Sequence, residues 1–384
     1  MNSHISRRKF IKDCIQKGTA IAVASKAITE LHWDNSVLAN TQNETPQVLT
    51  EAMFYKQQDG VMIQCILEPR GCIVNNQERG YCGARENRDG KYFSLVYSRP
   101  SAVYVEPIET DHFYHVHPGS QFFGLGTAGC NLGCKFCETW NLSQVRPEET
   151  EVQNLSPEEA IQLAQNKDCK IIDFTYNDPV ICYEYVLETA KLAKKNGIIT
   201  LCHTAGYINE EPLKALLKYI DAINVDLKGF TEDYYSKTCG VELKYVLNTL
   251  KSIKQEKVML EITNLLVTGH NDSKNDISSM ISWITDNLGD DVPLHFSRFF
   301  PNYQLTEPLA TPEETLEMAH DIAKSGGIKY VYIDNVPGHE YESTYCPSCK
   351  TKLIQRNGTE ITVLDMDKDG SCKKCNVKVP GIWS

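Results

Sequence analysis

Three closely spaced cysteines form the part of this sequence best suited to chemistry. Cys130, Cys134 and Cys137 follow a glycine-rich stretch with C-x3-C-x2-C spacing, and an aromatic residue precedes the last of them. A cubane iron–sulfur cluster takes one thiolate ligand per iron, so three cysteines would leave one iron open. An open coordination position is typical of a catalytic metal site, because a small ligand can bind there. The pattern predicts a [4Fe-4S] cluster; the alternatives are a structural zinc loop and three thiols without metal.

Four more cysteines form two close pairs near the end of the sequence. Cys346 pairs with Cys349, and Cys372 with Cys375, in two C-x2-C knuckles separated by 22 residues. Residues 352–358 between the knuckles read as a hairpin. Four thiolates in this arrangement are typical of a tetrahedral structural site of the zinc-ribbon kind. We therefore predict a tail that binds zinc, with rubredoxin-type iron as the alternative, and that performs no chemistry.

A third set of cysteines precedes the first. Cys65, Cys72 and Cys82 lie in a loop-rich region that also contains Glu68. Three thiolates and a carboxylate can bind zinc, but the sequence leaves metal binding by this set open. The cysteines that stand singly read as ordinary buried thiols, and they are Cys169, Cys182, Cys202 and Cys239.

The glycines before the first cysteine loop also match a nucleotide-binding pattern. Residues 124–129 read G-x-G-x-x-G after an expected strand, as in dinucleotide-binding folds. That fingerprint requires a helix to begin at the glycines, because the helix N-terminus holds the pyrophosphate. Here a cysteine loop follows at once, so we expect the glycines to let the backbone approach a bulky cluster. An NAD-dependent oxidoreductase is kept as an alternative.

Strands and helices alternate from residue 120 onward, and these elements must position the cysteines. Two helix starts, 156–159 and 311–314, each combine a hydroxyl residue, a proline and a glutamate. Regular alternation predicts an α/β fold with parallel strands in a partial or full TIM-type (β/α) barrel, which binds ligands at the carboxyl ends of its strands. The expected strands are 122–125, 170–175, 198–203, 222–227, 258–266, 294–299 and 329–333.

Length and charge limit the remaining classes of function. The chain has 384 residues and a formal net charge of −11, which argues against nucleic acid as the main partner. It has no run of about 18 apolar residues, so we expect no membrane span. The expected organisation is a signal segment over 1–40, a small cysteine-containing unit over 41–115, a barrel over 116–335 and a zinc-ribbon-like tail over 336–384.

The beginning of the chain carries an export pattern. Arg7 and Arg8 stand in the run Ser-Arg-Arg-Lys-Phe-Ile-Lys, and a mildly apolar stretch over 18–28 follows. This arrangement is typical of a twin-arginine signal, whose pathway carries proteins already folded around their cofactors. The predicted location is the periplasm; a cytoplasmic protein with an ordinary basic start is the alternative.

The cysteine loop and several later motifs resemble the radical S-adenosylmethionine (radical SAM) enzymes. The sequence looks like the radical SAM member of the AmmeMemoRadiSam group, which is similar to the activating enzymes of glycyl-radical proteins such as pyruvate formate-lyase. This resemblance implies a partial barrel with the cluster near the top of its first strand. The motifs that carry it are residues 126–137, 175–179, 221–229, 294–301 and the cysteine-paired tail.

The resemblance also implies which residues hold S-adenosylmethionine (SAM). Asn177 and Asp178 match the place that binds the methionyl ammonium, although the family commonly has glutamate at the second position. Asp226 and Lys228 match a pair that contacts the cofactor, and His295 matches a histidine beside the adenine. A structural alternative stays open for each: a helix-start turn at Asp178, a strand-end salt bridge for the pair, and a buried core histidine.

The activity implied by the resemblance is the reductive cleavage of SAM. One electron releases methionine and a 5′-deoxyadenosyl radical, which abstracts hydrogen from a substrate. The implied partners are a flavodoxin- or ferredoxin-like electron donor and, by analogy with the activating enzymes, a protein substrate. The alternative class is a non-enzymatic zinc or iron metalloprotein that scaffolds a partner.

Overall fold

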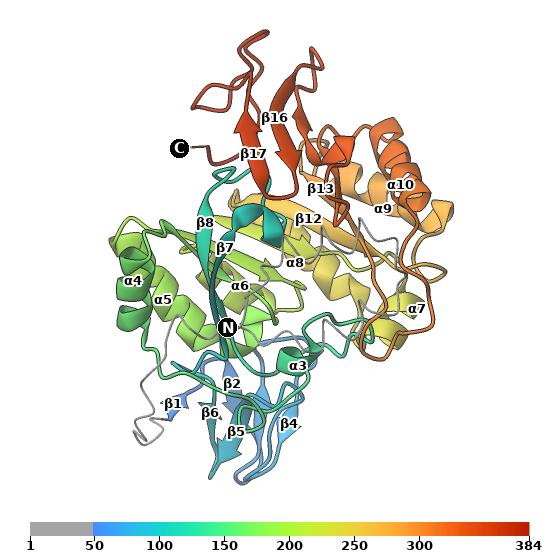
Figure 1. The fold of residues 1–384 in the computed structure, drawn as a ribbon. Coiled ribbons are helices and arrows are strands. Elements are labelled where there is room, and N and C mark those ends of the chain that lie inside the picture. Colours follow the sequence, from blue (N-terminus) through green and yellow to red (C-terminus); the bar gives the residue numbers. More distant parts are fainter. Residues whose placement is uncertain (1–48, 384) are drawn as a thin grey trace, which may run out of the picture. The chain divides into compact units, whose positions relative to one another are not determined.

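A central sheet of eight strands organises residues 49–383, the part of the chain that the computed structural model describes (Figure 1). The strand order is β14-β13-β12-β11-β10-β9-β8-β7, and the strands from β8 to β14 are parallel. Within the described residues the edge strands β14 and β7 do not pair with each other, so the sheet is a partial barrel. The predicted signal segment over 1–40 lies outside the described residues.

The seven strands expected after residue 120 are confirmed, with ends that shift by one or two residues. The eighth strand, β7, pairs antiparallel with β8 and so belongs to the barrel sheet, although the sequence division placed it in the N-terminal unit. The bounds are β7 (Ala102–Pro107), β8 (Gln121–Gly126), β9 (Ile171–Phe174), β10 (Ile199–Thr204), β11 (Ala222–Asp226), β12 (Met259–Leu266), β13 (Leu294–Arg298) and β14 (Val331–Asp334).

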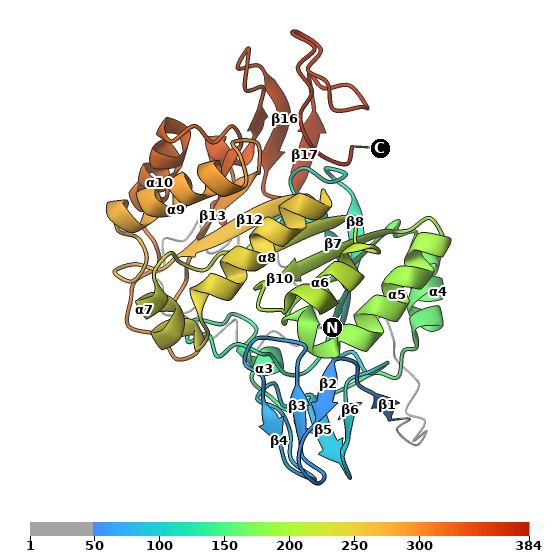
Figure 2. The same ribbon diagram turned by 180° about the vertical axis from the view of Figure 1, so that it is seen from behind.

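Helices connect the parallel strands, and Figure 2 shows α5, α6 and α8 lying over the outer side of the sheet. The helices are α3 (Trp140–Ser143), α4 (Pro157–Asn166), α5 (Tyr183–Lys195), α6 (Glu210–Leu217), α7 (Glu232–Tyr234), α8 (Leu243–Glu256), α9 (Lys274–Asn287) and α10 (Glu313–Ser325). Shorter turns are the 3-10 helices η2 (Ile108–Asp111), η3 (Pro179–Cys182) and η5 (Glu340–Glu342) and the π-helix η4 (Tyr235–Cys239). Among the described residues, none of these helices has the length and apolar character to cross a bilayer.

The two predicted helix starts behave differently. At Ser156 the capping box is formed, as predicted, and α4 begins directly after it. The prediction that Thr311 caps α10 is wrong, because its hydroxyl is buried and donates instead to the carbonyl of Leu266. The same hydroxyl accepts a hydrogen bond from Phe299 N at 3.2 Å. Thr311 therefore satisfies backbone groups at the ends of β12 and β13, where they would otherwise be buried without partners.

Two small antiparallel sheets precede the barrel and are fastened to it by a buried ion pair. Arg85 is 1% exposed, and its Nη2 lies 2.7 Å from Glu184 Oε2 at the start of α5. The sheets have the orders β1-β6-β5 and β2-β3-β4, with bounds β1 (Thr50–Glu51), β2 (Tyr55–Gln57), β3 (Ile63–Cys65), β4 (Ile73–Val74), β5 (Arg85–Arg88) and β6 (Lys91–Ser94).

The tail forms a third antiparallel sheet that packs on the barrel. Its strands are β15 (Thr344–Tyr345), β16 (Lys352–Asn357) and β17 (Glu360–Val363), which confirms the predicted hairpin. Leu353 and Ile354 share one buried hydrophobic cluster with Tyr114, Tyr330 and Tyr332 of the barrel region. The tail is therefore part of the same hydrophobic core as β14.

Candidate functional site

The predicted cluster loop leaves the carboxyl end of β8 directly after Gly126. Cys134 is buried, and Cys130 and Cys137 are half-buried. Burial raises the pKa of Cys130 well above its usual value and also raises that of Cys137. These thiols would therefore be neutral on their own, whereas iron binds and stabilises the thiolate form. Three thiols on one loop at the mouth of a parallel sheet fit the ligand set of a cluster with one open iron.

Cys239, which the sequence alone suggested was an ordinary buried thiol, lies beside this loop. A hydrogen bond with Cys239 and burial raise the pKa of Cys134 well above its usual value. The backbone joins the same segments, because Gly133 N donates to Cys239 O at 2.9 Å. Thiolates bound to different irons of a cubane stand farther apart than hydrogen-bonded sulfurs do. Cys239 therefore lies where it supports Cys134 rather than as a ligand to a separate iron.

Glycine at position 129 lets the loop approach the N-terminal unit. Gly129 has a φ of +97°, and a Cβ there would lie 2.3 Å from the carbonyl oxygen of Cys82. A side chain is therefore excluded for both conformational and steric reasons. Residues 127–139 form turns and loop, and α3 begins only at Trp140, so no helix starts at the glycines. The geometry lacks the helix N-terminus that a dinucleotide-binding site needs.

Asn177, predicted to contact SAM, holds the start of the cluster loop. Its Oδ1 accepts from Thr127 N at 3.0 Å, and its Nδ2 donates to Gly129 O at 2.8 Å. A third hydrogen bond of 3.2 Å reaches Thr127 Oγ1. The side chain ties the end of β9 to the loop that follows β8. In this structure Asn177 thus positions the cysteines.

Asp178 adopts the helix-start turn that the sequence left open as an alternative. Its Oδ1 accepts from Val180 N at 3.0 Å and thereby caps η3. The same oxygen accepts from Thr204 Oγ1 at 3.1 Å, and Oδ2 accepts from Ala205 N at 3.1 Å. Asp178 therefore joins the ends of β9 and β10. Burial raises its pKa, and it lies close enough to Cys130 to raise the pKa of that thiol.

Asp226 and Lys228 form the strand-end ion pair that the sequence left open as the structural alternative, next to the cluster loop. Lys228 Nζ lies 2.8 Å from Asp226 Oδ2 and 5.6 Å from the ring centre of Phe136. Burial alone would lower the pKa of Lys228, but the Asp226 carboxylate and the thiolate form of Cys134 raise it well above its usual value. The Asp226 side chain is 26% exposed and that of Lys228 is 14% exposed. A permanent cation beside the cysteine loop is thus within reach of an anionic ligand.

The inner face of the sheet carries a buried polar network that the sequence reasoning missed. His203 Nδ1 lies 3.0 Å from Asp111 Oδ1, and His203 Nε2 lies 3.3 Å from Asp226 Oδ1. Burial alone would lower the pKa of His203, but the two carboxylates raise it well above its usual value. The signal was present in the sequence as polar residues at alternate positions of buried strands, such as Asn224 with Asp226 on β11.

Unsatisfied polar atoms on this inner face fit a polar ligand. Asn224 Oδ1, Thr263 Oγ1 and Tyr176 Oη are buried without a hydrogen-bond partner in the part of the chain that is described. Thr263 stands directly opposite Asp226 in the register of β11 and β12. Unpaired buried polar groups cost free energy, so such a surface favours a ligand with many donors and acceptors. SAM carries an ammonium group, a carboxylate and ribose hydroxyls, and so fits these residues.

His295 lies inside the barrel between two carboxylates. It is fully buried, with Nε2 2.8 Å from Glu261 Oε2 and Nδ1 2.9 Å from Asp334 Oδ2. Its ring also packs edge-on against Tyr114, with centroids 4.8 Å apart. Both ring nitrogens are therefore engaged by carboxylates. A contact between His295 and the adenine stays a prediction.

Comparisons with known proteins agree with this geometry. The model of the radical SAM superfamily matches residues 125–284, which contain the cysteine loop and the strands from β9 to β12. The chain is also 41% identical over 332 residues to an uncharacterised protein of Methanocaldococcus jannaschii, a match that covers 86% of this chain and 99% of the relative. The chain belongs to the radical SAM superfamily.

Two further proteins are similar at lower identity. The pyruvate formate-lyase-activating enzyme of Staphylococcus aureus is 25% identical over 228 residues, covering 56% of this chain and 89% of that enzyme. A solved radical SAM methyltransferase from Sphaerobacter thermophilus aligns over 86% of this chain and 93% of its own, with 14% identity and a TM-score of 0.47. Superfamily membership indicates radical chemistry with a [4Fe-4S] cluster and SAM, in place of the nicotinamide alternative.

The early cysteines of this radical SAM protein gather beside the cluster loop. Cys65, Cys72 and Cys82 line a small cavity together with Glu68, and Asn131 of the loop forms part of the same wall. Burial raises the pKa of Glu68 to about 7. The structure thus brings three thiols and a carboxyl group into one pocket, although they lie up to 17 residues apart in sequence.

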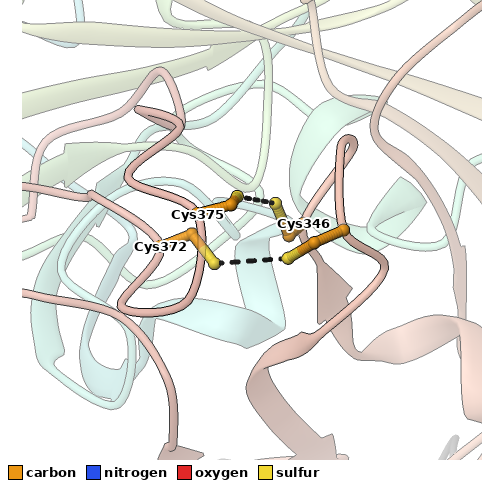
Figure 3. A group of neighbouring side chains, drawn as sticks. Cys346, Cys372 and Cys375 are labelled. Atoms are coloured by element: carbon orange, nitrogen blue, oxygen red, sulfur yellow. Dashed lines mark hydrogen bonds between the residues drawn. The ribbon is translucent and has the colours of Figure 1, made fainter.

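The tail cysteines converge as a single group. Their four sulfur atoms lie within 4.8 Å of one another. Cys346 Sγ is 3.4 Å from Cys375 Sγ, and Cys349 Sγ is 3.6 Å from Cys372 Sγ, so each contact joins one knuckle to the other (Figure 3). This spacing fits four thiolates around one tetrahedral ion. The site is closed by protein ligands, which is typical of a structural metal.

Proposed function

We propose that this radical SAM protein cleaves SAM reductively and transfers the radical to a protein substrate, as activating enzymes do. The cysteine loop above a polar inner surface, with the Asp226–Lys228 pair at its side, carries this proposal. The similarity to the pyruvate formate-lyase-activating enzyme of S. aureus supports the protein substrate. The motifs shared with the radical SAM member of the AmmeMemoRadiSam group favour a partner protein from that group.

The proposed reaction needs one external electron. A flavodoxin- or ferredoxin-like donor supplies it to the cluster, the C–S bond of SAM breaks into methionine and a 5′-deoxyadenosyl radical, and this radical takes a hydrogen atom from the substrate to give 5′-deoxyadenosine. The chain's own residues bind, orient and shield. Asn177 and Asp178 hold the loop, and Lys228 offers a cation to the carboxylate of the cofactor.

The experiment is anaerobic reconstitution of the full chain with iron and sulfide, followed by dithionite and SAM. We expect about four irons per chain bound through the loop, and formation of 5′-deoxyadenosine. Zinc alone with no adenosine product would contradict the proposal and favour the scaffold alternative. Product analysis by mass spectrometry with candidate partner proteins then tests the protein substrate.

Lys228→Met tests the assigned cofactor site. Because the variant removes the buried cation beside the loop, we expect SAM affinity to fall by about tenfold or more, equal to about 1.4 kcal/mol or more. Lys254→Met is the matched control, since Lys254 pairs with Asp291 at 2.8 Å beyond the opposite ends of the strands. Equal SAM affinity in the two variants would remove Lys228 from the site.

We further propose zinc as the ion of the tail. Four thiolates at tetrahedral spacing suit zinc or iron, and zinc needs no redox role at a site closed by protein ligands. Metal analysis of the purified chain separates the two ions.

A further inference from the structure

A second group of metal-type ligands lies inside the barrel, apart from the cysteines. His112, His295 and Asp334 each bring one ligand atom within 4.8 Å of the others. They come from three elements: the residue after η2, the strand β13 and the end of β14. Neither His112 nor Asp334 has a part in the proposed cofactor site. Their convergence therefore calls for a separate explanation.

The ligand atoms meet at one carboxylate, where two buried polar atoms stay without a hydrogen bond within residues 49–383. His112 Nδ1 lies 2.7 Å from Asp334 Oδ2, yet it forms no hydrogen bond with any described residue. His295 Nδ1 lies 2.9 Å from the same oxygen. Asp334 Oδ1 is buried without a partner in the described part of the chain, and the side chain is only 2% exposed. A cation at this point would supply the partner that His112 Nδ1 and Asp334 Oδ1 lack, and it would replace the proton between His295 and Asp334.

Glu261 supports His295 in the way that metal sites commonly support a histidine ligand. Its Oε2 lies 2.8 Å from His295 Nε2. Glu261 is itself fixed by the backbone, because it accepts from Tyr114 N at 3.1 Å and from His115 N at 2.8 Å. When the Nε2 proton is shared with this carboxylate, a neutral His295 has the lone pair of Nδ1 available for a metal ion, which would take the place of the proton that Nδ1 shares with Asp334. A carboxylate on the remote nitrogen orients the ring and raises its basicity as a ligand.

The backbone holds His112 in a strained conformation that places its ring in this group. His112 has a φ of +58°, in the left-handed region that non-glycine residues adopt uncommonly, although histidine does so more often than most. Its carbonyl accepts from Asn224 Nδ2 at 2.8 Å, which holds the turn against β11. Such strain costs about 1–2 kcal/mol and persists where surrounding structure enforces it, often at ligand sites.

We propose that His112, His295 and Asp334 bind one divalent transition-metal ion, zinc or iron(II), inside the barrel. Nitrogen and oxygen ligands of one tetrahedral zinc ion stand about 3.3 Å apart, because the bonds measure about 2.0–2.1 Å. The contacts of 2.7 and 2.9 Å to Asp334 Oδ2 therefore have to open by about 0.5 Å to admit the ion. Two imidazoles favour zinc or iron over magnesium or calcium. The ion also offsets the two buried carboxylates, Asp334 and Glu261. Three protein ligands leave room in the coordination sphere for a further ligand.

The competing explanation is a network of hydrogen bonds and ion pairs without a metal ion. In that case His295 carries two protons, forms ion pairs with Glu261 and Asp334, and needs no metal. The two explanations differ in metal content rather than in activity. They are therefore separable whether or not the protein cleaves SAM.

The test is metal analysis of the anaerobically purified full chain, followed by calorimetric titration with Zn²⁺ after dialysis against a chelator. The variants are His112→Ala and Asp334→Asn, the second of which keeps the shape of the side chain. We expect each to lose about one equivalent of nitrogen- and oxygen-bound metal relative to the native chain, while cluster iron and tail metal stay unchanged. His203→Ala is the matched control, because this inner-face histidine also lies between two carboxylates, Asp111 and Asp226, but outside the group. It should keep the full metal content.

Two results would overturn the site. One is a native chain that binds no metal beyond the cysteine sites, either as purified or in the titration. The other is an Asp334→Asn chain, folded by circular dichroism, whose metal content and Zn²⁺ stoichiometry equal those of the native chain. If His295 serves the adenine instead, His295→Ala weakens SAM binding while Asp334→Asn leaves the metal content unchanged.

Discussion

The side chains predicted to contact the cofactor differ in whether their polar atoms are already bound to other parts of the chain. The Asn177 amide forms hydrogen bonds with the backbone of the cluster loop. The Asp178 carboxylate accepts hydrogen bonds from η3 and from the residue that follows β10. Asp226 and Lys228 are partly exposed and bind each other, and Asp226 also contacts His203. The first pair fixes the loop and the second pair offers charge to a ligand.

Gly129 gives a direct test of how closely the cluster loop must pack. Gly129→Ala should lower the iron content of the reconstituted chain and destabilise the fold by about 1–3 kcal/mol, because the new methyl group would overlap the Cys82 carbonyl. Gly197→Ala is the control: its φ of +68° is also positive, but nothing lies within 4 Å of the added Cβ. Iron content measured on both variants separates the clash from backbone strain. Equal iron content would show that the close approach is dispensable.

Glu68 should make stability depend on pH. Burial raises its pKa from 4.5 to about 7, so the unfolded chain loses this proton first as the pH rises. The free energy of unfolding should therefore fall by about 3 kcal/mol across this window, mostly between pH 5 and pH 8, and then level off. Glu68→Gln removes this loss. Urea unfolding of both proteins at pH 5 and pH 8 checks it, and parallel pH profiles would contradict the assignment.

At the scale of elements, the parallel strands place polar residues at every second position, so that these residues share the inner face of the sheet. On β12 and β13, Glu261, Thr263, His295 and Ser297 occupy alternate positions, all of them buried. A strand buried on both faces usually reads as a nearly continuous apolar run. Polar residues at every second position of these buried strands therefore indicate a binding site on the inner face, where a purely structural strand would be apolar.

The tail sheet should depend on its metal. Cys349 is exposed, so Cys349→Ser removes a ligand without damaging packing. We expect loss of the tail ion and a fall in Tm of about 5 °C or more, since a structural metal contributes directly to folding. Cys169→Ser is the control, because this thiol is buried away from the tail group and should leave the metal content unchanged. Retention of the ion by the Cys349 variant would contradict the four-thiolate site.

At the scale of the whole molecule, the barrel sheet and the tail sheet meet around one segment. Residues 112–116 carry His112, and their backbone bonds Glu261 within the barrel. The tail holds the same segment, because Arg356 Nη2 donates to Tyr114 O at 2.7 Å. On the other side, the ion pair of Arg85 with Glu184 fastens the N-terminal sheets. Breaking such a buried pair costs about 3–5 kcal/mol.

The location of the protein is also a property of the whole chain, and we propose export by the twin-arginine route. Replacing Arg7 and Arg8 together by lysine should keep the protein in the cytoplasm, because the signal depends on the paired arginines. Cell fractionation with immunodetection, in a host that has this pathway, measures the change. Unaltered distribution between periplasm and cytoplasm would favour the cytoplasmic alternative.

Local chemistry in the sequence determined the elements and indicated the cysteine loop. The alternation of strands and helices, the capping box at Ser156 and the spacing of Cys130, Cys134 and Cys137 each depend on residues close together in the chain. Such features can be predicted from the sequence because a helix start, a turn or a chelating loop involves only a few neighbouring residues. The same reasoning was wrong at Thr311, where a distant carbonyl competed for the hydroxyl.

The tertiary structure alone decided which polar side chains meet inside the barrel. His112, His295 and Asp334 lie on three elements separated by up to 222 residues, and Asn177 bonds a loop 48–50 residues away. Each of these contacts depends on the curvature and register of the whole sheet, which no local pattern encodes. Burial then sets their charge and their need for partners, because only the folded chain removes water from them.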